Sequence, residues 1–143
     1  MAGRQRTPIR ARTRRRTRGI SGRGVERIQM NRILHVVPDL VPYGLERVVA
    51  SLVKWRNRSQ FQTDVVSLYD AEDGSIGNVL ERAGAKIYYL GKRRGFDRRM
   101  FSRFTSVLKE VRPDVVHSHN YVLRYTLWPA LREKVPVQLH TIH

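Results

Sequence analysis

Residues 32–57 place the strongest limits on what this chain can fold into. They begin with a nearly continuous apolar run at residues 33–37, as expected for a strand covered on both faces of its sheet. Pro38 ends this run, and a loop with one glycine, Gly44, follows. An amphipathic helix is then predicted by apolar residues that recur every three or four positions: Leu45, Val48, Val49 and Leu52. A strand, a loop and a helix in this order form the first unit of a parallel α/β sheet.

The rest of the chain repeats this unit. Apolar and β-branched runs predict further strands at residues 63–69, 86–90, 115–118 and 137–142. The segments between them predict helices at residues 76–83, 97–111 and 121–133. Ser75, Asp97 and Asn120 are the expected caps, and Pro129 predicts a kink or a late start of the last helix. This alternation predicts an α/β fold with a doubly wound, parallel, Rossmann-like sheet.

The order of the strands follows from right-handed crossovers. The commonest order for such a chain is 3-2-1-4-5, in which strands one and four are neighbours. Ligands bind in the crevice between the carboxyl ends of these two strands. The predicted site therefore lies at two loops, residues 38–44 and residues 119–121. No helix is predicted to cover the fifth strand, so we expect the chain to be a fragment.

The first 29 residues differ in composition from the rest. They contain ten arginines against one acid, Glu26, which leaves +9 of the formal net charge of +16 in this leader. Almost nothing in it is apolar, which predicts disorder because little burial can offset the ordering entropy. Two interpretations compete: a basic arm for nucleic acid or anionic lipid, or non-native sequence upstream of a true initiator at Met30. The folded domain is then residues 30–143.

Composition and motifs exclude several classes of protein. The chain has no cysteine, which excludes disulfides and thiolate metal sites. No apolar run approaches the roughly 20 residues of a membrane-spanning helix. A secretory signal is not expected either, because no apolar segment follows the basic N-terminus. The fingerprint G-x-G-x-x-G is absent, so NAD binding is rejected.

Three residues in the predicted crevice suit a ligand. Gly44 lies where the first loop meets its helix, and the free N–H groups of a helix N-terminus favour a phosphate; an ordinary tight turn is the alternative. His119 ends the fourth strand at the crevice, so we expect it to contact substrate. His117 lies on the same side of that strand and offers a second imidazole for a metal. A structural core histidine is the favoured interpretation of His117, and no metal site is expected.

Other candidates have structural explanations beside functional ones. His35 and His140 lie inside strands and are expected to be structural, whereas His143 at the end of the fifth strand is within reach of a ligand. Glu46 opens the first helix, where a carboxylate suits the positive helix end as well as it suits catalysis. A cluster of basic residues predicts either a solvated face or attraction to an anionic membrane: Lys92, Arg93, Arg94, Arg98, Arg99 and Arg103.

Three segments together resemble one family. ILHVVPDLVPYGLERVVASL, PDVVHSHN and VPVQLHTIH resemble, in order and spacing, the N-terminal domain of glycosyltransferase family 4 enzymes of the GT-B fold. The resemblance covers residues 32–143. It implies two Rossmann-like domains that face a cleft, with this half holding the acceptor and the other half holding a nucleotide-diphosphate sugar. It also implies retaining transfer that needs no metal ion and no further cofactor.

The resemblance assigns roles to individual residues. Tyr43 and Gly44 match the glycine-rich loop near the donor diphosphate and the acceptor, and His119 matches the histidine that contacts the transferred sugar. His143 matches a position lining the same cleft, and Asn120 in the crevice loop is expected to bind substrate with it. Tyr43 departs from the usual glycine pair, which puts the diphosphate contact in doubt. The family's C-terminal half is missing, so we expect no transferase activity from this chain alone.

These observations predict the acceptor-side half of a retaining glycosyltransferase. Its substrates would be a nucleotide-diphosphate sugar and a saccharide or lipid-linked acceptor, at the cytoplasmic face of the inner membrane. One alternative is a basic nucleic-acid-binding module, which the leader favours, although no groove-reading helix or aromatic sheet face is recognised. Another is a stand-alone binding subunit whose cleft a partner chain completes.

Overall fold

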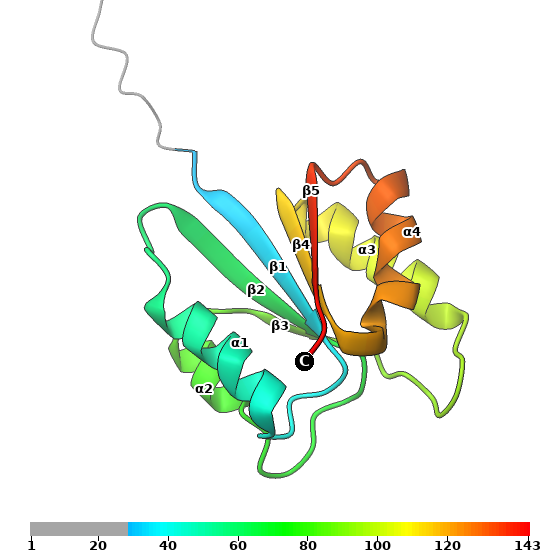
Figure 1. Cartoon of the computed structure of the whole chain (residues 1–143), viewed down its shortest axis with the longest axis horizontal. Coiled ribbons are helices and arrows are strands. Elements are labelled where there is room, and N and C mark those ends of the chain that lie inside the picture. Colours follow the sequence, from blue (N-terminus) through cyan, green and yellow to red (C-terminus); the bar gives the residue numbers. More distant parts are fainter. Residues whose placement is uncertain (1–28) are drawn as a thin grey trace, which may run out of the picture.

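The computed structural model describes residues 29–143 (Figure 1). Residues 1–28, and with them almost all of the predicted leader, lie outside the described residues. Strands and helices alternate, with one short 3-10 turn, η1, before the last helix. Their bounds are β1 Asn31–Val37, α1 Gly44–Trp55, β2 Phe61–Ser67, α2 Gly77–Arg82, β3 Ile87–Tyr89, α3 Arg99–Val111, β4 Val115–His119, η1 Asn120–Val122, α4 Leu123–Arg132 and β5 Val137–Thr141.

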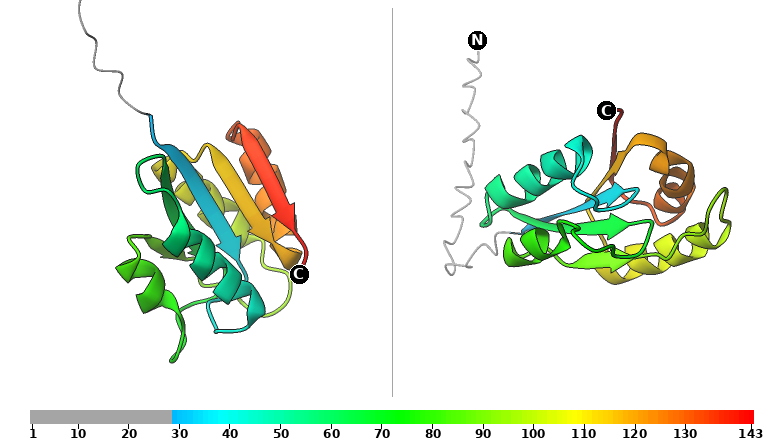
Figure 2. Two further views of the ribbon diagram at one scale, coloured as in Figure 1. Left: turned by 60° about the vertical axis from the view of Figure 1, so that its left-hand side comes forward. Right: turned by 90° about the horizontal axis from the view of Figure 1, so that it is seen from below.

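The five strands form one parallel sheet in the order β3-β2-β1-β4-β5, which confirms the predicted fold class and strand order. β1 lies at the centre and pairs with β2 on one side and with β4 on the other. Helices lie on both sides of the sheet (Figure 2). The β1–β4 pair is the point where the strand order reverses, and it joins segments about eighty residues apart in the chain, as in the pair of His35 with His117.

Alternate residues of β1 serve opposite faces of the sheet, as the pleat of a strand requires. Leu34 and Val36 are fully buried in a core with residues of α3 and α4. Val37 is fully buried in a second core with residues of α1 and α2. A strand that is apolar on both faces is therefore the element that joins the two cores.

The buried face of α1 differs from the predicted one. Leu45 and Val49 are buried as expected, but Val48 and Leu52 are 44% and 45% exposed. Val53 is fully buried in place of Leu52. Apolar residues cover a wide arc of this helix, so their spacing alone does not fix its rotation, and packing against the sheet decides it.

The helix caps also differ from the predictions. Ser75 makes no capping hydrogen bond, and α2 begins at Gly77. Asp97 does accept a hydrogen bond from the Arg99 N–H at 3.1 Å, as α3 begins. Asn120 caps no helix, because its φ of 57° lies in the left-handed region and its side chain bonds elsewhere. α4 accordingly starts late, at Leu123, and contains Pro129.

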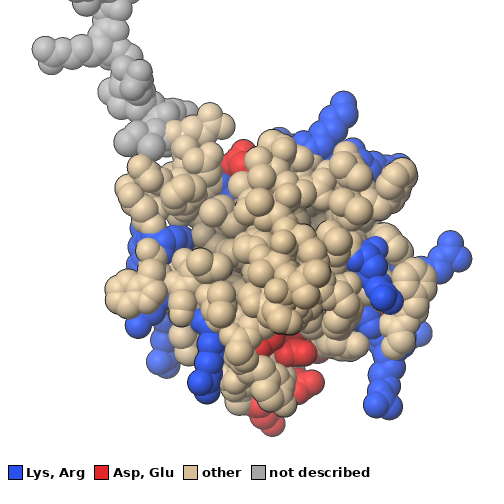
Figure 3. Space-filling model, in the orientation of Figure 1, with Lys and Arg blue, Asp and Glu red and all other residues tan. Residues whose placement is uncertain are grey.

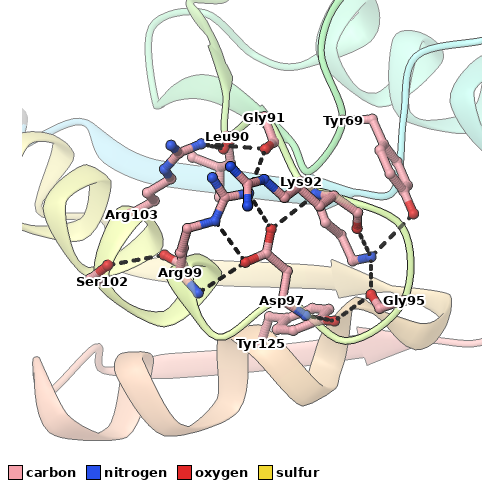
Figure 4. A network of polar contacts seen from close by, with 11 residues as sticks. Tyr69, Leu90, Gly91, Lys92, Gly95, Asp97, Arg99, Ser102, Arg103 and Tyr125 are labelled. Atoms are coloured by element: carbon pink, nitrogen blue, oxygen red, sulfur yellow. Dashed lines mark hydrogen bonds and ion pairs between the residues drawn. The ribbon is translucent and has the colours of Figure 1, made fainter.

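Half of the predicted basic cluster holds the β3–α3 loop in place (Figure 4). Lys92 is buried, and its Nζ donates to the Tyr69 hydroxyl at 3.1 Å and to the carbonyl oxygens of Arg93 and Gly95. Arg99 forms an ion pair with the buried Asp97 at 2.6 Å. The guanidinium of Arg103 donates to the carbonyl oxygens of Leu90 and Gly91. These three cations are structural groups.

The remaining cations of the cluster, Arg93, Arg94 and Arg98, are exposed. Phe96 lies between them in the sequence and is 61% exposed, with its ring stacked on that of Tyr125 at a centroid distance of 5.7 Å. Of the six basic residues that were considered for attraction to a membrane, only these three are therefore free of a structural role among the described residues, and they lie around one exposed aromatic ring.

The difference in burial between two phenylalanines gives a direct test of the packing. Phe104 is fully buried in the α3 core, so Phe104→Ala should lower the free energy of unfolding by about 3–5 kcal/mol through lost burial and a residual cavity. Phe96→Ala, a matched change at an exposed position, should cost less than about 1 kcal/mol. Urea unfolding followed by circular dichroism measures both, and equal losses would contradict this packing.

Candidate functional site

The carboxyl ends of β1, β4 and β5 bring four of the five histidines together. His35 pairs in register with His117 across the β1–β4 junction, and their ring centroids are 5.1 Å apart. His119 lies two residues beyond His117 on the same face, with a centroid distance of 4.1 Å. His143 follows β5 and lies 5.4 Å from the His119 ring. The predicted crevice residues His119 and His143 therefore meet, together with two histidines that were expected to be structural.

His119 is the centre of this group. It is 1% exposed, and both its ring nitrogens have histidine partners. Nε2 lies 3.3 Å from His35 Nδ1, and Nδ1 lies 3.1 Å from His143 Nε2. A neutral imidazole donates from one nitrogen and accepts at the other, so the His119 tautomer fixes the direction of both bonds. Since His143 is exposed, a ligand that displaces its ring reaches His119 at Nδ1.

Burial keeps the inner histidines neutral. It lowers the pKa of His35 from its ordinary value near 6.5 to about 3, with a smaller contribution from neighbouring His117. Burial likewise lowers the pKa of His119 to about 3, helped by repulsion from the surrounding histidines. The pKa of the half-buried His117 is lowered by the same cause. At neutral pH these three inner imidazoles are therefore uncharged, and they donate and accept hydrogen bonds.

Asn120 holds the end of the chain against this group. Its side-chain oxygen accepts a hydrogen bond from the His143 N–H at 2.9 Å. The left-handed φ of 57°, which asparagine tolerates better than most residues, turns the chain sharply after β4. Asn120 therefore positions His143 beside His119, a role that the sequence pattern did not indicate.

Tyr43 and Gly44 lie where the crevice loop of residues 38–44 meets the start of α1. Tyr43 is the N-terminal cap residue, makes no side-chain cap bond and is 71% exposed. A Cβ added at Gly44 would meet nothing within 4 Å, so the space in front of this helix end is open. The first N–H groups of an uncapped helix and its positive dipole end favour an anion there.

Glu46, for which the sequence left a structural and a catalytic role open, is buried at the start of α1. It is only 4% exposed, and among the described residues its Oε2 is the buried side-chain atom without a hydrogen-bond partner. Burial raises the pKa of this carboxyl, and the charge of Asp39 adds to the shift. A buried polar atom without a partner is costly, and such atoms are retained where a ligand or water satisfies them. No sequence pattern reveals this, because an acid at a helix start is common.

An apolar groove of about 790 Å³ extends from the histidines along α1. His35 and His117 lie at its floor, and Val48, Leu52 and Trp55 form the wall on α1. Leu139 of β5 lines it and is 50% exposed. Figure 3 shows the molecule from the side on which α1 and β5 lie nearest the viewer. Few charged side chains appear in the centre of this view. The rotation of α1 that exposes Val48 and Leu52 is what creates this groove.

Acidic residues gather at the lower end of the same view, toward the carboxyl ends of the strands (Figure 3). The β2–α2 loop contributes three exposed acids, Asp70, Glu72 and Asp73. Such a field weakens the binding of an anion by this chain alone. Positive charge for a diphosphate would then have to come from elsewhere.

No helix among residues 29–143 is both long enough and apolar enough to cross a membrane.

Comparisons with known proteins find a matching family model and several solved structures that resemble the chain. The family model described as Glycosyltransferase Family 4 matches residues 42–143. Among solved structures, the chain is similar to a UDP-GlcNAc 2-epimerase from Neisseria meningitidis bound to UDP-GlcNAc, with 18% identity and a TM-score of 0.48. That match covers 76% of this chain and 31% of the epimerase. A search of curated proteins finds no match.

The neutral histidines predict a stability that depends on pH. The unfolded chain binds protons at His35 and His119 near pH 6.5, whereas the folded chain does so only near pH 3. Because the unfolded state binds more protons in this window, the free energy of unfolding should fall as the pH falls from 6.5 toward 3. Urea unfolding at several pH values measures the slope.

Two asparagine variants test whether the buried histidines cause this pH dependence of the free energy of unfolding. His35→Asn removes one of the three histidines whose pKa is lowered, and it should flatten the pH dependence of the free energy of unfolding. His140→Asn changes an exposed histidine that bonds Ser118 from β5, and it should keep the full slope. An unchanged slope in His35→Asn would contradict the assignment.

Proposed function

Because the chain belongs to Glycosyltransferase Family 4, we propose that it forms the acceptor-side half of a retaining glycosyltransferase. The reaction would move a sugar from a nucleotide-diphosphate donor to a saccharide or lipid-linked acceptor. The observation that carries this proposal is the crevice at the β1–β4 junction. At the carboxyl edge of the sheet lie the open N-terminus of α1 at Gly44, the buried Glu46, whose Oε2 has no hydrogen-bond partner among the described residues, and the buried His119.

Each group has a distinct proposed role. The backbone N–H groups at Gly44 donate hydrogen bonds to the oxygens of the donor diphosphate, which a helix N-terminus favours. His119 hydrogen-bonds a hydroxyl of the transferred sugar through Nδ1, after the ligand displaces His143. Glu46 accepts a hydrogen bond from a hydroxyl of the sugar or acceptor, which supplies the missing partner of Oε2. Tyr43, exposed at the mouth, stacks on an acceptor ring.

The charge around the crevice suggests which half of the enzyme binds the donor strongly. The crevice is neutral or acidic near the β2–α2 loop, so a diphosphate gains little from this half. Strong donor binding would require cationic groups from a facing domain. We therefore propose that the chain by itself binds a donor weakly and transfers no sugar.

Contact with a membrane is proposed for the loop between β3 and α3. Arg93, Arg94 and Arg98 are exposed there, around the exposed ring of Phe96. Basic residues near an anionic surface contribute about 1 kcal/mol each, and an aromatic ring suits the headgroup region. In this proposal the loop holds the enzyme at the cytoplasmic face of the membrane, beside a lipid-linked acceptor.

Gly44→Ala tests the diphosphate contact without disturbing the fold. The new methyl group meets nothing within 4 Å in the protein, so folding should be unchanged. It would project where the diphosphate approaches the backbone, and the dissociation constant for UDP should rise roughly three- to tenfold, about 0.6–1.4 kcal/mol. Isothermal titration or ligand-detected NMR measures it.

Ser51→Ala is the matched control, because this exposed residue lies on the same helix, and its hydroxyl bonds the Arg47 carbonyl inside the helix. It should leave UDP affinity unchanged. The arginine-rich leader is the same in all these proteins, so its own attraction for UDP cancels in the comparison. Equal affinity of Gly44→Ala and the parent protein would contradict the contact.

A further inference from the structure

We propose that His35, His117 and His119 form a binding site for Zn²⁺ or a similar first-row transition-metal ion. This site shares His119 with the proposed sugar contact but uses its other ring nitrogen, Nε2, and the family resemblance implies no metal. Each of the three side chains offers one ring nitrogen, and these atoms all lie within 4.8 Å of one another. Imidazole is a preferred ligand of Zn²⁺, Cu²⁺, Ni²⁺ and Co²⁺.

The distance between the ring nitrogens of His35 and His119 is the one expected for two ligands of a tetrahedral ion. A Zn–N bond of 2.0–2.1 Å separates two tetrahedral ligand nitrogens by about 3.3 Å. His35 Nδ1 and His119 Nε2 are 3.3 Å apart. Ring centroids of ligands to one such ion lie about 5 Å apart, and the His35 ring lies 5.1 Å from His117 and 5.6 Å from His119. Only the His117–His119 spacing of 4.1 Å has to widen.

Two of the three histidines have a hydrogen-bond partner on the ring nitrogen that would not bind the metal. These partners favour the tautomer that leaves the other nitrogen free for the ion. His119 uses Nε2 as a ligand when its proton is on Nδ1, where it donates to His143 Nε2 at 3.1 Å. The Nε2 of His117 lies 2.8 Å from the Thr141 hydroxyl, which leaves Nδ1 for the ion. Metal-bound histidines commonly have such a second partner, which orients the ring.

The surroundings also suit an ion that enters from solution. His35 and His117 line the apolar groove, so an ion has a path to them, and water from the groove would complete its coordination. The imidazoles come from two neighbouring strands, so the ion would link β1 to β4 at the strand-order reversal. An ion that binds only the folded state raises the melting temperature.

The competing explanation is a hydrogen-bonded pair of neutral histidines that never binds metal. Titration of the full chain with Co²⁺ separates the two, because tetrahedral Co²⁺ with nitrogen ligands absorbs strongly in the visible range, and Zn²⁺ then displaces it. The chain contains no cysteine, and residues 1–28 contain no histidine, so the leader supplies no imidazole or thiolate. We expect one ion per chain and a higher melting temperature with Zn²⁺.

Variants assign the ligands. His117→Gln should weaken Zn²⁺ binding at least tenfold, and Thr141→Val, which removes only the partner of His117, should weaken it roughly tenfold. His140→Gln is the matched control: it alters a histidine of β5 that bonds Ser118 on the other face of the sheet, and it should leave affinity unchanged.

Histidine ring resonances provide a readout that needs no variant. In the parent protein, Zn²⁺ should shift the rings of His35, His117 and His119 together, at one equivalent. The proposal is overturned if Co²⁺ produces no tetrahedral spectrum, if the three rings do not respond together, or if His140→Gln weakens binding as much as His117→Gln. Each of these outcomes is independent of UDP binding at Gly44, so the two proposals fail separately.

Discussion

The parallel pairing of β1 with β4 is the interaction on which the rest of this structure depends. It joins two segments far apart in the sequence and places His35 directly beside His117. It also makes β1 a central strand, with Leu34 and Val36 buried on one face and Val37 on the other. Both cores, and the crevice at the carboxyl ends, therefore follow from a single register.

The same pairing concentrates polar groups that are costly to bury. His119 is almost fully buried, and Glu46 has a carboxylate oxygen without a partner among the described residues. Elsewhere buried polar groups are well satisfied, as around Lys92 and Asp97 in the β3–α3 loop. The contrast is between a network whose polar groups are satisfied within the fold and a carboxylate oxygen at the crevice that the described residues leave without a partner.

The alternation of strands and helices was predictable because each strand carries its own apolar run, and handedness then fixed the strand order. The rotation of α1 was not predictable: both Leu52 and Val53 are apolar, and only the sheet decides that Val53 is buried. The sequence indicated His119, Asn120 and His143 as crevice residues, but not the contacts among them. His35 joins them through the β1–β4 register, and Asn120 through a left-handed turn, neither of which local pattern reveals.

The central claim is that ligands of this chain bind at the β1–β4 crevice. A residue-by-residue map of backbone amide shifts, recorded while the full chain is titrated with a UDP-sugar, tests it most directly. The account predicts shifts at Gly44, Leu45 and Glu46 and around His119 and His143, even when affinity is weak. Shifts confined to the arginine-rich leader, with none at the crevice, would contradict it.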